Sequence, residues 1–161
     1  MMKNLFKFTI ILLLVIVNSV QAQVKPTTAA ERLNGIQKRK LLEKDTTLNS
    51  IKFRNVGPGI MSGRVVDVDV NPNDPTEFYV AYATGGLWYT KNNGQSLVPV
   101  FDKENVFGIG DIAVNWKDGI IWIGTGEANS SRSSYRGLGV YKSVDKGKTW
   151  EHLGLTESHH I

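Results

Sequence analysis

Carboxylates are the residues in this chain whose placement could support chemistry. Cleavage of a glycosidic bond usually needs two carboxyl groups, about 5–5.5 Å apart when configuration is retained and farther apart when it is inverted. Four acidic residues lie near expected strand starts or at the opening of a long loop: Asp67, Asp69, Asp111 and Glu127. Glu127 opens the loop, so it is the candidate catalytic residue. The alternative is a loop carboxylate that pairs with Arg132 or Arg136.

The same loop supplies the candidate ligand-binding residues Arg132, Tyr135 and Arg136. Guanidinium groups bind carboxylates, and a tyrosine ring can stack on a sugar. A sialidase would use an arginine cluster, a tyrosine and an acid, and these residues together with Arg64 are compatible with that chemistry. The alternative is a solvated connection between two strands.

Other kinds of site find little support. Asp67 and Asp111 occupy the same position in an internal repeat, which favours a structural role. His159 and His160 are adjacent, so on a strand they would point to opposite faces and not share a metal. No nucleotide-binding loop, Ser-His-Asp arrangement or redox motif is present. We expect no metal site and no cofactor.

The element that must position these residues is marked by the octapeptide 143–150, which reads S-x-D-x-G-x-T-W, the spacing of an Asp-box or BNR repeat. We expect a hairpin in which Asp145 accepts backbone hydrogen bonds and Gly147 supplies positive φ. Ser143 and Thr149 are expected to pair across the turn. Trp150 is expected to bury its ring between neighbouring repeats. These five residues are assigned a structural role.

A second, divergent copy of the box occupies residues 90–97, with Asn92 in place of the aspartate. The segment 67–71 matches 111–115 at an offset of 44 residues, whereas Gly94 matches Gly147 at an offset of 53. The pair Thr84-Gly85 matches Thr125-Gly126 at an offset of 41, which places a 12-residue insertion at about 127–138. Repeats of this length with box hairpins are typical of β-propeller blades.

The fold class predicted is therefore all-β, with about two four-stranded blades of a larger propeller. Strands are expected at 64–70, 78–83, 86–90, 97–101, 109–115, 120–124, 139–143 and 150–153. Since a closed propeller typically needs about 4–8 blades, we expect the chain to be the N-terminal part of a longer protein. Assembly of blades between chains is the alternative.

The first 50 residues precede the blades. Residues 1–22 read as a signal peptide, with Lys3 and Lys7 before a short apolar run, and an uncleaved anchor is the alternative. Cleavage would remove those two lysines and no acidic residue, which lowers the net charge from +4 to +2 and gives no reason to expect nucleic acid. Residues 23–50 are expected to be partly helical over 29–44, with the basic run 38–40 on a solvated face. The domain 51–161 follows. The chain has no cysteine, so disulfides and lipid attachment at cysteine are excluded.

Several segments resemble exported bacterial sortilin-like propeller proteins, which are often labelled BNR-repeat glycosyl hydrolases. The resemblance covers about residues 50–161 and is carried by 53–58, 62–67, 85–88, 123–129, 133–135 and 139–143. It implies a large multi-bladed propeller, and the sortilin members bind peptides and proteins. The box itself is shared by sialidases, xyloglucan-cleaving propellers and sortilins, so it indicates a fold and not an activity. This chain lacks the remaining blades of a full member.

Two functions follow as hypotheses. The first is an exported, secreted, periplasmic or cell-surface module that binds protein, peptide or carbohydrate, with no nucleic-acid partner and no membrane span after signal cleavage. The second is a glycoside hydrolase, sialidase-like or acting on polysaccharides, whose site other blades complete. A third reading is a scaffold fragment from a truncated gene. Loss of activity on Glu127→Gln would exclude pure binding.

Overall fold

The computed structural model describes residues 27–51, 63–128 and 134–161. The predicted signal peptide and the candidate ligand residue Arg132 lie outside these ranges. Helix α2 (Ala29–Leu42) occupies the segment expected to be helical. It begins at Thr28, whose hydroxyl accepts from the N–H of Glu31 while the Glu31 carboxylate accepts from the N–H of Thr28, a reciprocal capping box. A short helix, α3 (Thr46–Asn49), follows.

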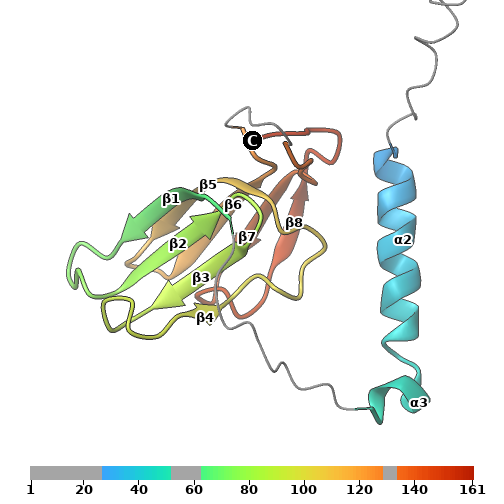
Figure 1. Ribbon diagram of the computed structural model, residues 1–161, viewed down its shortest axis with the longest axis horizontal. Helices are drawn as coiled ribbons and strands as arrows, with labels where there is room; N and C mark the ends of the chain where they lie inside the picture. The colour runs from blue at the N-terminus through green and yellow to red at the C-terminus, as the bar shows by residue number, and fades with distance from the viewer. Residues whose placement is uncertain (1–26, 52–62, 129–133) are drawn as a thin grey trace, which may run out of the picture.

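The first sheet contains β1 (Val65–Val70), β2 (Phe78–Tyr82), β3 (Gly86–Thr90) and β4 (Val98–Pro99). Each strand pairs antiparallel with the next in the chain, so the strand order is β1-β2-β3-β4 (Figure 1). The alternation of β1 and the turn 71–75 produce this meander, because one face of β1 packs inward while the turn reverses the chain.

The second sheet contains β5 (Ile109–Asn115), β6 (Ile120–Thr125), β7 (Val140–Ser143) and β8 (Glu151–Gly154), in the order β5-β6-β7-β8. The register shifts between Ile109 and Asp111, as it does between Val65 and Asp67 in the first sheet. The irregularity recurs at the same repeat position, which supports the offset of 44. Both sheets therefore have the strand order of propeller blades, and the predicted fold class is confirmed for the two blades.

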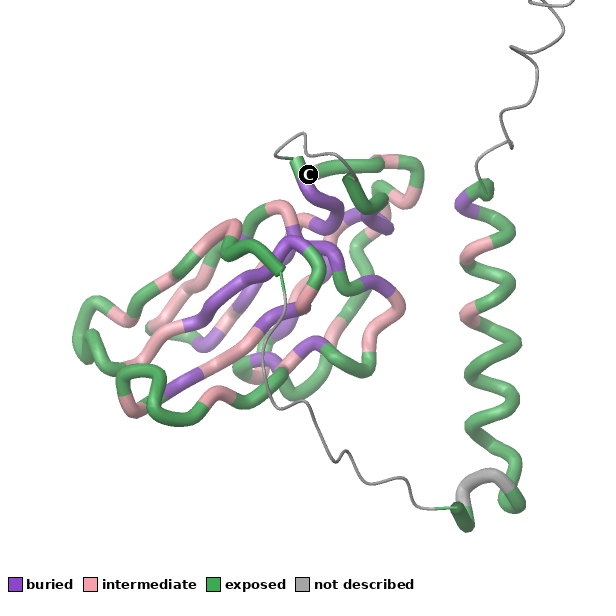
Figure 2. The backbone as a smooth tube through the Cα atoms, viewed as in Figure 1, coloured by how far each residue is buried: buried purple, intermediate pink, exposed green. Residues whose placement is uncertain are grey.

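The core lies between the two blades, where buried segments of both sheets face each other (Figure 2). Tyr79 of β2 packs against Trp116 with the rings tilted and their centroids 5.2 Å apart, and Phe101 meets Tyr141 of β7 edge-on at 5.3 Å. Trp150 contacts Phe101 at 5.0 Å and donates from Nε1 to the carbonyl of Val100 at 2.7 Å. The expectation that Trp150 packs between the blades is confirmed.

Two aspartates of β1 join the blades by hydrogen bonds. Asp69 accepts from the N–H of Val114 at 2.9 Å and from the indole of Trp116 at 2.6 Å. Asp67 accepts from the N–H of Ile112 at 3.3 Å. The two bonds from backbone N–H groups join the first strand of one blade to the first strand of the next. Asp69 thus satisfies a backbone donor at the blade junction, and Asp67 shares the Ile112 N–H with Asp111.

The box hairpins show how the sequence motif works. Asp145 Oδ1 accepts from the Ser143 hydroxyl at 2.8 Å and the Thr149 N–H at 2.9 Å, and Oδ2 accepts from the Thr149 hydroxyl at 2.6 Å. The two hydroxyls therefore each bond to Asp145, which corrects the expected direct pairing between them. Lys146 and Gly147 both have positive φ, 60° and 84°. The hairpin requires left-handed backbone at both positions, and the sequence indicated only the glycine.

Candidate functional site

The end of β6 where the candidate catalytic residue lies is tightly packed. Thr125 is fully buried, and its hydroxyl donates to the carbonyl of Gly139 at 2.5 Å and accepts from the N–H of Leu138 at 2.7 Å. This hydroxyl holds together the two ends of the loop 126–139, which we name the β6–β7 loop. Gly126 has φ of 91°, and a Cβ there would lie 2.1 Å from the carbonyl oxygen of His159. A side chain is therefore excluded at this position.

Glu127 is buried inside this loop, with 2% of its surface exposed. Its backbone N–H donates to the carbonyl of Tyr135 at 3.2 Å, and its carboxylate forms an ion pair with the guanidinium of Arg64. The expected partners were the loop residues Arg132 or Arg136. The structure instead pairs Glu127 with a residue that directly precedes β1, so the ion pair connects the two blades. Sequence distance concealed this, because 63 positions separate the partners.

The described part of the loop presents two predicted ligand-binding residues to solvent. Tyr135 is 54% exposed, and Arg136 is also exposed. Both lie just before the buried segment 137–139. The loop therefore combines the buried Glu127 at its base with the exposed Tyr135 and Arg136 on its surface.

The remaining candidate carboxylates form a close pair. The Asp111 carboxyl is hydrogen-bonded to that of Asp67. Burial is the larger cause that raises the pKa of Asp111 above its usual value, and this hydrogen bond is the second. Asp111 also accepts from the N–H of Ile112 at 3.0 Å. Two carboxyl groups in direct contact are closer together than the catalytic pair of a retaining glycosidase, whose separation is about 5–5.5 Å. Their geometry suits the junction between first strands, where Asp67 already bonds to β5.

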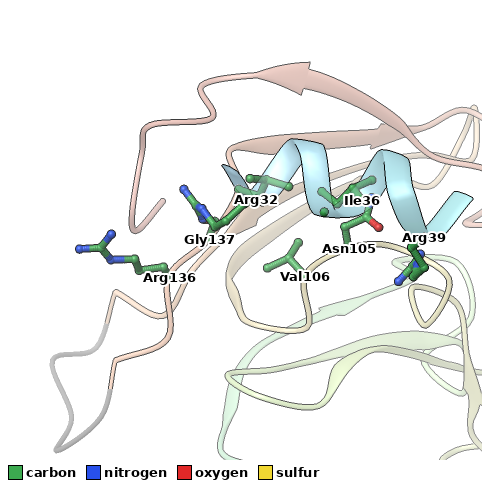
Figure 3. Close-up of a pocket in the computed structure, with 9 residues that line it drawn as sticks. Arg32, Ile36, Arg39, Asn105, Val106, Arg136 and Gly137 are labelled. Carbon is green, nitrogen blue, oxygen red and sulfur yellow. The ribbon is translucent and has the colours of Figure 1, made fainter. Parts of the chain in front are cut away.

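Beside the β6–β7 loop lies a cavity of about 330 Å³ that the sequence did not indicate. Helix α2 forms one wall, the connection between β4 and β5 a second, and the β6–β7 loop a third (Figure 3). The wall from α2 presents Arg32, Ile36 and Arg39, spaced as one face of a helix. That i, i+4, i+7 spacing was the signal available in the sequence.

Contacts of these arginines fix α2 against the second blade and against the connection between β4 and β5. Arg32 donates to the carbonyls of Gly137 at 2.6 Å and Thr156 at 3.2 Å. Arg39 donates to the carbonyl of Lys103 at 3.2 Å and forms an ion pair with Glu43. The basic run 38–40 was expected on a solvated face. All three residues are exposed, and Arg39 also contacts the blade domain and lines the cavity.

Two other features bear on the predicted classes of site. Within residues 27–51, 63–128 and 134–161, no group of three His, Asp or Glu residues could hold a metal ion. The His159 and His160 rings lie 6.3 Å apart. Of the helices in the same ranges, none is both long and apolar enough to cross a membrane.

Comparisons with known proteins identify no family. No family model matches the chain, and no curated protein matches it. Among solved structures, the chain resembles the GH74 enzyme of Niastella koreensis, with 20% identity and a TM-score of 0.43. The match covers 57% of this chain and 14% of that structure. A likeness this weak carries no argument, so the blade assignment depends on strand order and register.

Proposed function

We propose that this chain is part of an exported β-propeller that binds carbohydrate or peptide ligands at the β6–β7 loop. The observation that carries the proposal is the division of roles around that loop. Each carboxylate that could act in hydrolysis has a structural partner, Glu127 with Arg64 and Asp67 with β5 and Asp111. The exposed Tyr135 and Arg136 have the chemistry of recognition.

The burial of Glu127 favours a supporting role. A general acid must reach the leaving-group oxygen within hydrogen-bond distance, about 2.6–3.2 Å. Glu127 is enclosed and its charge is compensated by the guanidinium of Arg64. We assign Glu127 to the anchoring of the loop base against the first blade.

Binding is tested on an array of neutral glycans, acidic glycans and peptides with the full chain. Tyr135→Ala and Arg136→Ala should reduce retention at least fivefold on the ligand that the array identifies. Matched controls are Val144→Ala and Lys148→Ala, exposed residues in the box turn at the opposite end of β7. Retention equal for all four variants would refute the loop as the binding surface.

A further inference from the structure

We infer that Asp102, Phe107 and Tyr135 form a platform that binds a neutral sugar ring of an oligosaccharide. This inference rests on the proposed binding function and narrows its ligand class from carbohydrate or peptide to neutral carbohydrate. The connection between β4 and β5 supplies Asp102 and Phe107, and the β6–β7 loop supplies Tyr135. Tyr135 was a predicted ligand-binding residue, whereas the sequence did not indicate the other two.

Backbone contacts hold the platform in place. The N–H of Gly86 in β3 donates to the carbonyl of Phe107 at 3.1 Å, and the N–H of Gly126 donates to the carbonyl of Gly108 at 2.8 Å. A Cβ at Gly108 would lie 3.6 Å from the Cβ of Tyr135, so the loop crosses this glycine closely. The backbone below both rings is thus bonded to both blades, and a ligand need not order it on binding.

Two aromatic side chains of the platform are open to solvent. Phe107 is 52% exposed and Tyr135 is 54% exposed. Single exposed apolar residues are common on protein surfaces and indicate nothing by themselves. Here two aromatic residues flank one glycine, and their few rotatable bonds mean that little conformational entropy is lost on binding. An aromatic ring that packs on the C–H face of a sugar removes apolar area of both partners from water.

The carboxylate of Asp102 lies beside the Phe107 ring. A Cβ at Gly86 would lie 3.6 Å from Oδ1 of Asp102 and 3.8 Å from Cδ1 of Phe107, so both side chains border this glycine. Asp102 is an exposed residue, and partial burial of its carboxyl raises the pKa of the group. Within the part of the chain that the structure describes, no hydrogen bond or ion pair engages this carboxylate. An ionised carboxylate only accepts hydrogen bonds, so it suits a ligand that donates them.

The combination of these groups matches the surface of a sugar ring. A pyranose carries C–H groups on its face and hydroxyl groups at its rim, so one ring can cover Phe107 while its hydroxyls donate to Asp102. Ligand sites generally combine aromatic and apolar surface with a small number of convergent polar groups. The juxtaposition of an open aromatic ring with an unengaged acceptor therefore favours a ligand that is apolar on its face and a donor at its edge.

Charge around the platform favours a neutral ligand. Asp102 would repel a carboxylated or sulfated sugar. An arginine side chain of a peptide could stack on Phe107 and pair with Asp102. The exposed cations Lys103 and Arg136, which adjoin Asp102 and Tyr135 in the sequence, would repel such a peptide. Because charges of both signs surround the platform, neither ionic class is favoured, and we assign the neutral sugar.

The test is calorimetric titration of the full chain with three neutral tetrasaccharides, cellotetraose, mannotetraose and maltotetraose. An acidic sugar, tetra-galacturonic acid, and a blocked peptide of alternating glycine and arginine serve as the charged probes. We expect saturable binding of at least one neutral sugar, at least tenfold tighter than binding of either charged probe. A smaller preference, or no saturable binding of any neutral sugar, would overturn the assignment.

Replacement of Phe107 connects this binding to the platform. Phe107→Ala should weaken binding of the preferred neutral sugar at least tenfold, whereas Phe107→Trp should keep the affinity within about threefold, because indole offers an aromatic face of the same kind. Both variants should melt close to the parent temperature, since surface substitutions rarely change stability. Unchanged affinity in Phe107→Ala would overturn the role of the ring, whatever the melting temperature.

Replacement of Asp102 tests the acceptor. Asp102→Asn should weaken the same binding about fivefold, because a neutral amide oxygen is a weaker acceptor than a carboxylate. Matched controls are Val144→Ala, which changes a 63% exposed apolar residue, and Asp118→Asn, which changes an exposed acid in the turn between β5 and β6. Both controls should bind as the parent does. Losses in the controls equal to those at Asp102 and Phe107 would overturn the location of the site.

The outcome also separates this inference from the proposed function. If the array shows ligand retention that depends on Tyr135 and Arg136 but not on Phe107 or Asp102, the loop binds ligand and the platform assignment fails. The same holds if only peptides or acidic glycans are retained. If no arrayed ligand is retained, the proposed function fails with the platform.

Discussion

Replacement of Asp145 tests how the box hairpin holds the second blade together. Its carboxylate receives three hydrogen bonds, two of them from Thr149 and one from Ser143, at 2.6–2.9 Å. Asp145→Ala removes all three at once and leaves the Thr149 N–H without its acceptor. Removal of a comparable side-chain cap from a helix costs about 0.5–2 kcal/mol. We expect a loss of about 2 kcal/mol, because one group closes both sides of the turn.

The ionisation of Asp145 gives this prediction a pH dependence. The Thr149 hydroxyl, then the Thr149 N–H, lower the pKa of Asp145 from 3.8 to about 2. A depressed pKa means that the folded state favours the ionised form, so the contribution is complete above the unfolded value. It is lost as the pH falls through the folded value. The shift corresponds to more than 2 kcal/mol, and solvent screening at this exposed turn reduces it to about 1 kcal/mol.

The control is Asp145→Asn, because the first blade already uses asparagine at this position. Asn92 Oδ1 accepts from the Ser96 N–H and from the Thr90 hydroxyl, both at 2.9 Å. We expect the asparagine variant to stay within about 0.5 kcal/mol of the parent at pH 7. In urea unfolding at pH 7 and pH 2.5, the deficit of this variant should be smaller at the lower pH, which approaches the folded pKa of Asp145. If Asp145→Ala were as stable as the parent at pH 7, the reasoning would be refuted. It would also be refuted if the stability loss of Asp145→Asn were larger at pH 2.5 than at pH 7.

Three further changes test the blade junction and the loop base, each by urea unfolding. Asp69→Ala should lower the free energy of unfolding by about 2–3 kcal/mol, because the Val114 N–H and the Trp116 indole lose their acceptor. Asp69→Asn should lower it by less, and equal losses would contradict this account. Asp111→Asn should raise stability by a few tenths of a kcal/mol at pH 7. The raised pKa of Asp111 means that folding favours its protonated form, so its unfavourable effect grows as the pH rises through that pKa; a destabilised variant would contradict it. Thr125→Val should lower the free energy of unfolding by about 2 kcal/mol, since two buried hydrogen bonds of its hydroxyl are lost. An unchanged urea midpoint would show that this hydroxyl does not hold the loop.

The blades could be predicted from local signals in the sequence. Alternation over 65–70, turn residues at 71–75 and the two box copies each specify a strand or a hairpin within a few residues. All eight strands occur where expected, with shorter bounds at β4. The helix was also predicted, and the structure adds that Thr28 and Glu31 form a capping box at its start.

The site could not be predicted to the same depth, because its contacts join distant segments. The pairing of Glu127 with Arg64 depends on how two blades pack, and no local pattern encodes it. The cavity exists only because α2 lies against loops more than 60 residues away in sequence. The repeat did indicate that Asp67 was structural, since a position repeated in each blade serves the junction between blades.

The central claim is that the β6–β7 loop binds its ligand and does not hydrolyse it. The most direct measurement incubates the full chain with the glycan retained on the array and quantifies bound ligand and new reducing ends in the same sample. The account predicts bound ligand and no new reducing ends, with binding reduced by Tyr135→Ala. Formation of reducing ends by the parent chain, abolished by Glu127→Gln in a variant that still folds and binds, would contradict it.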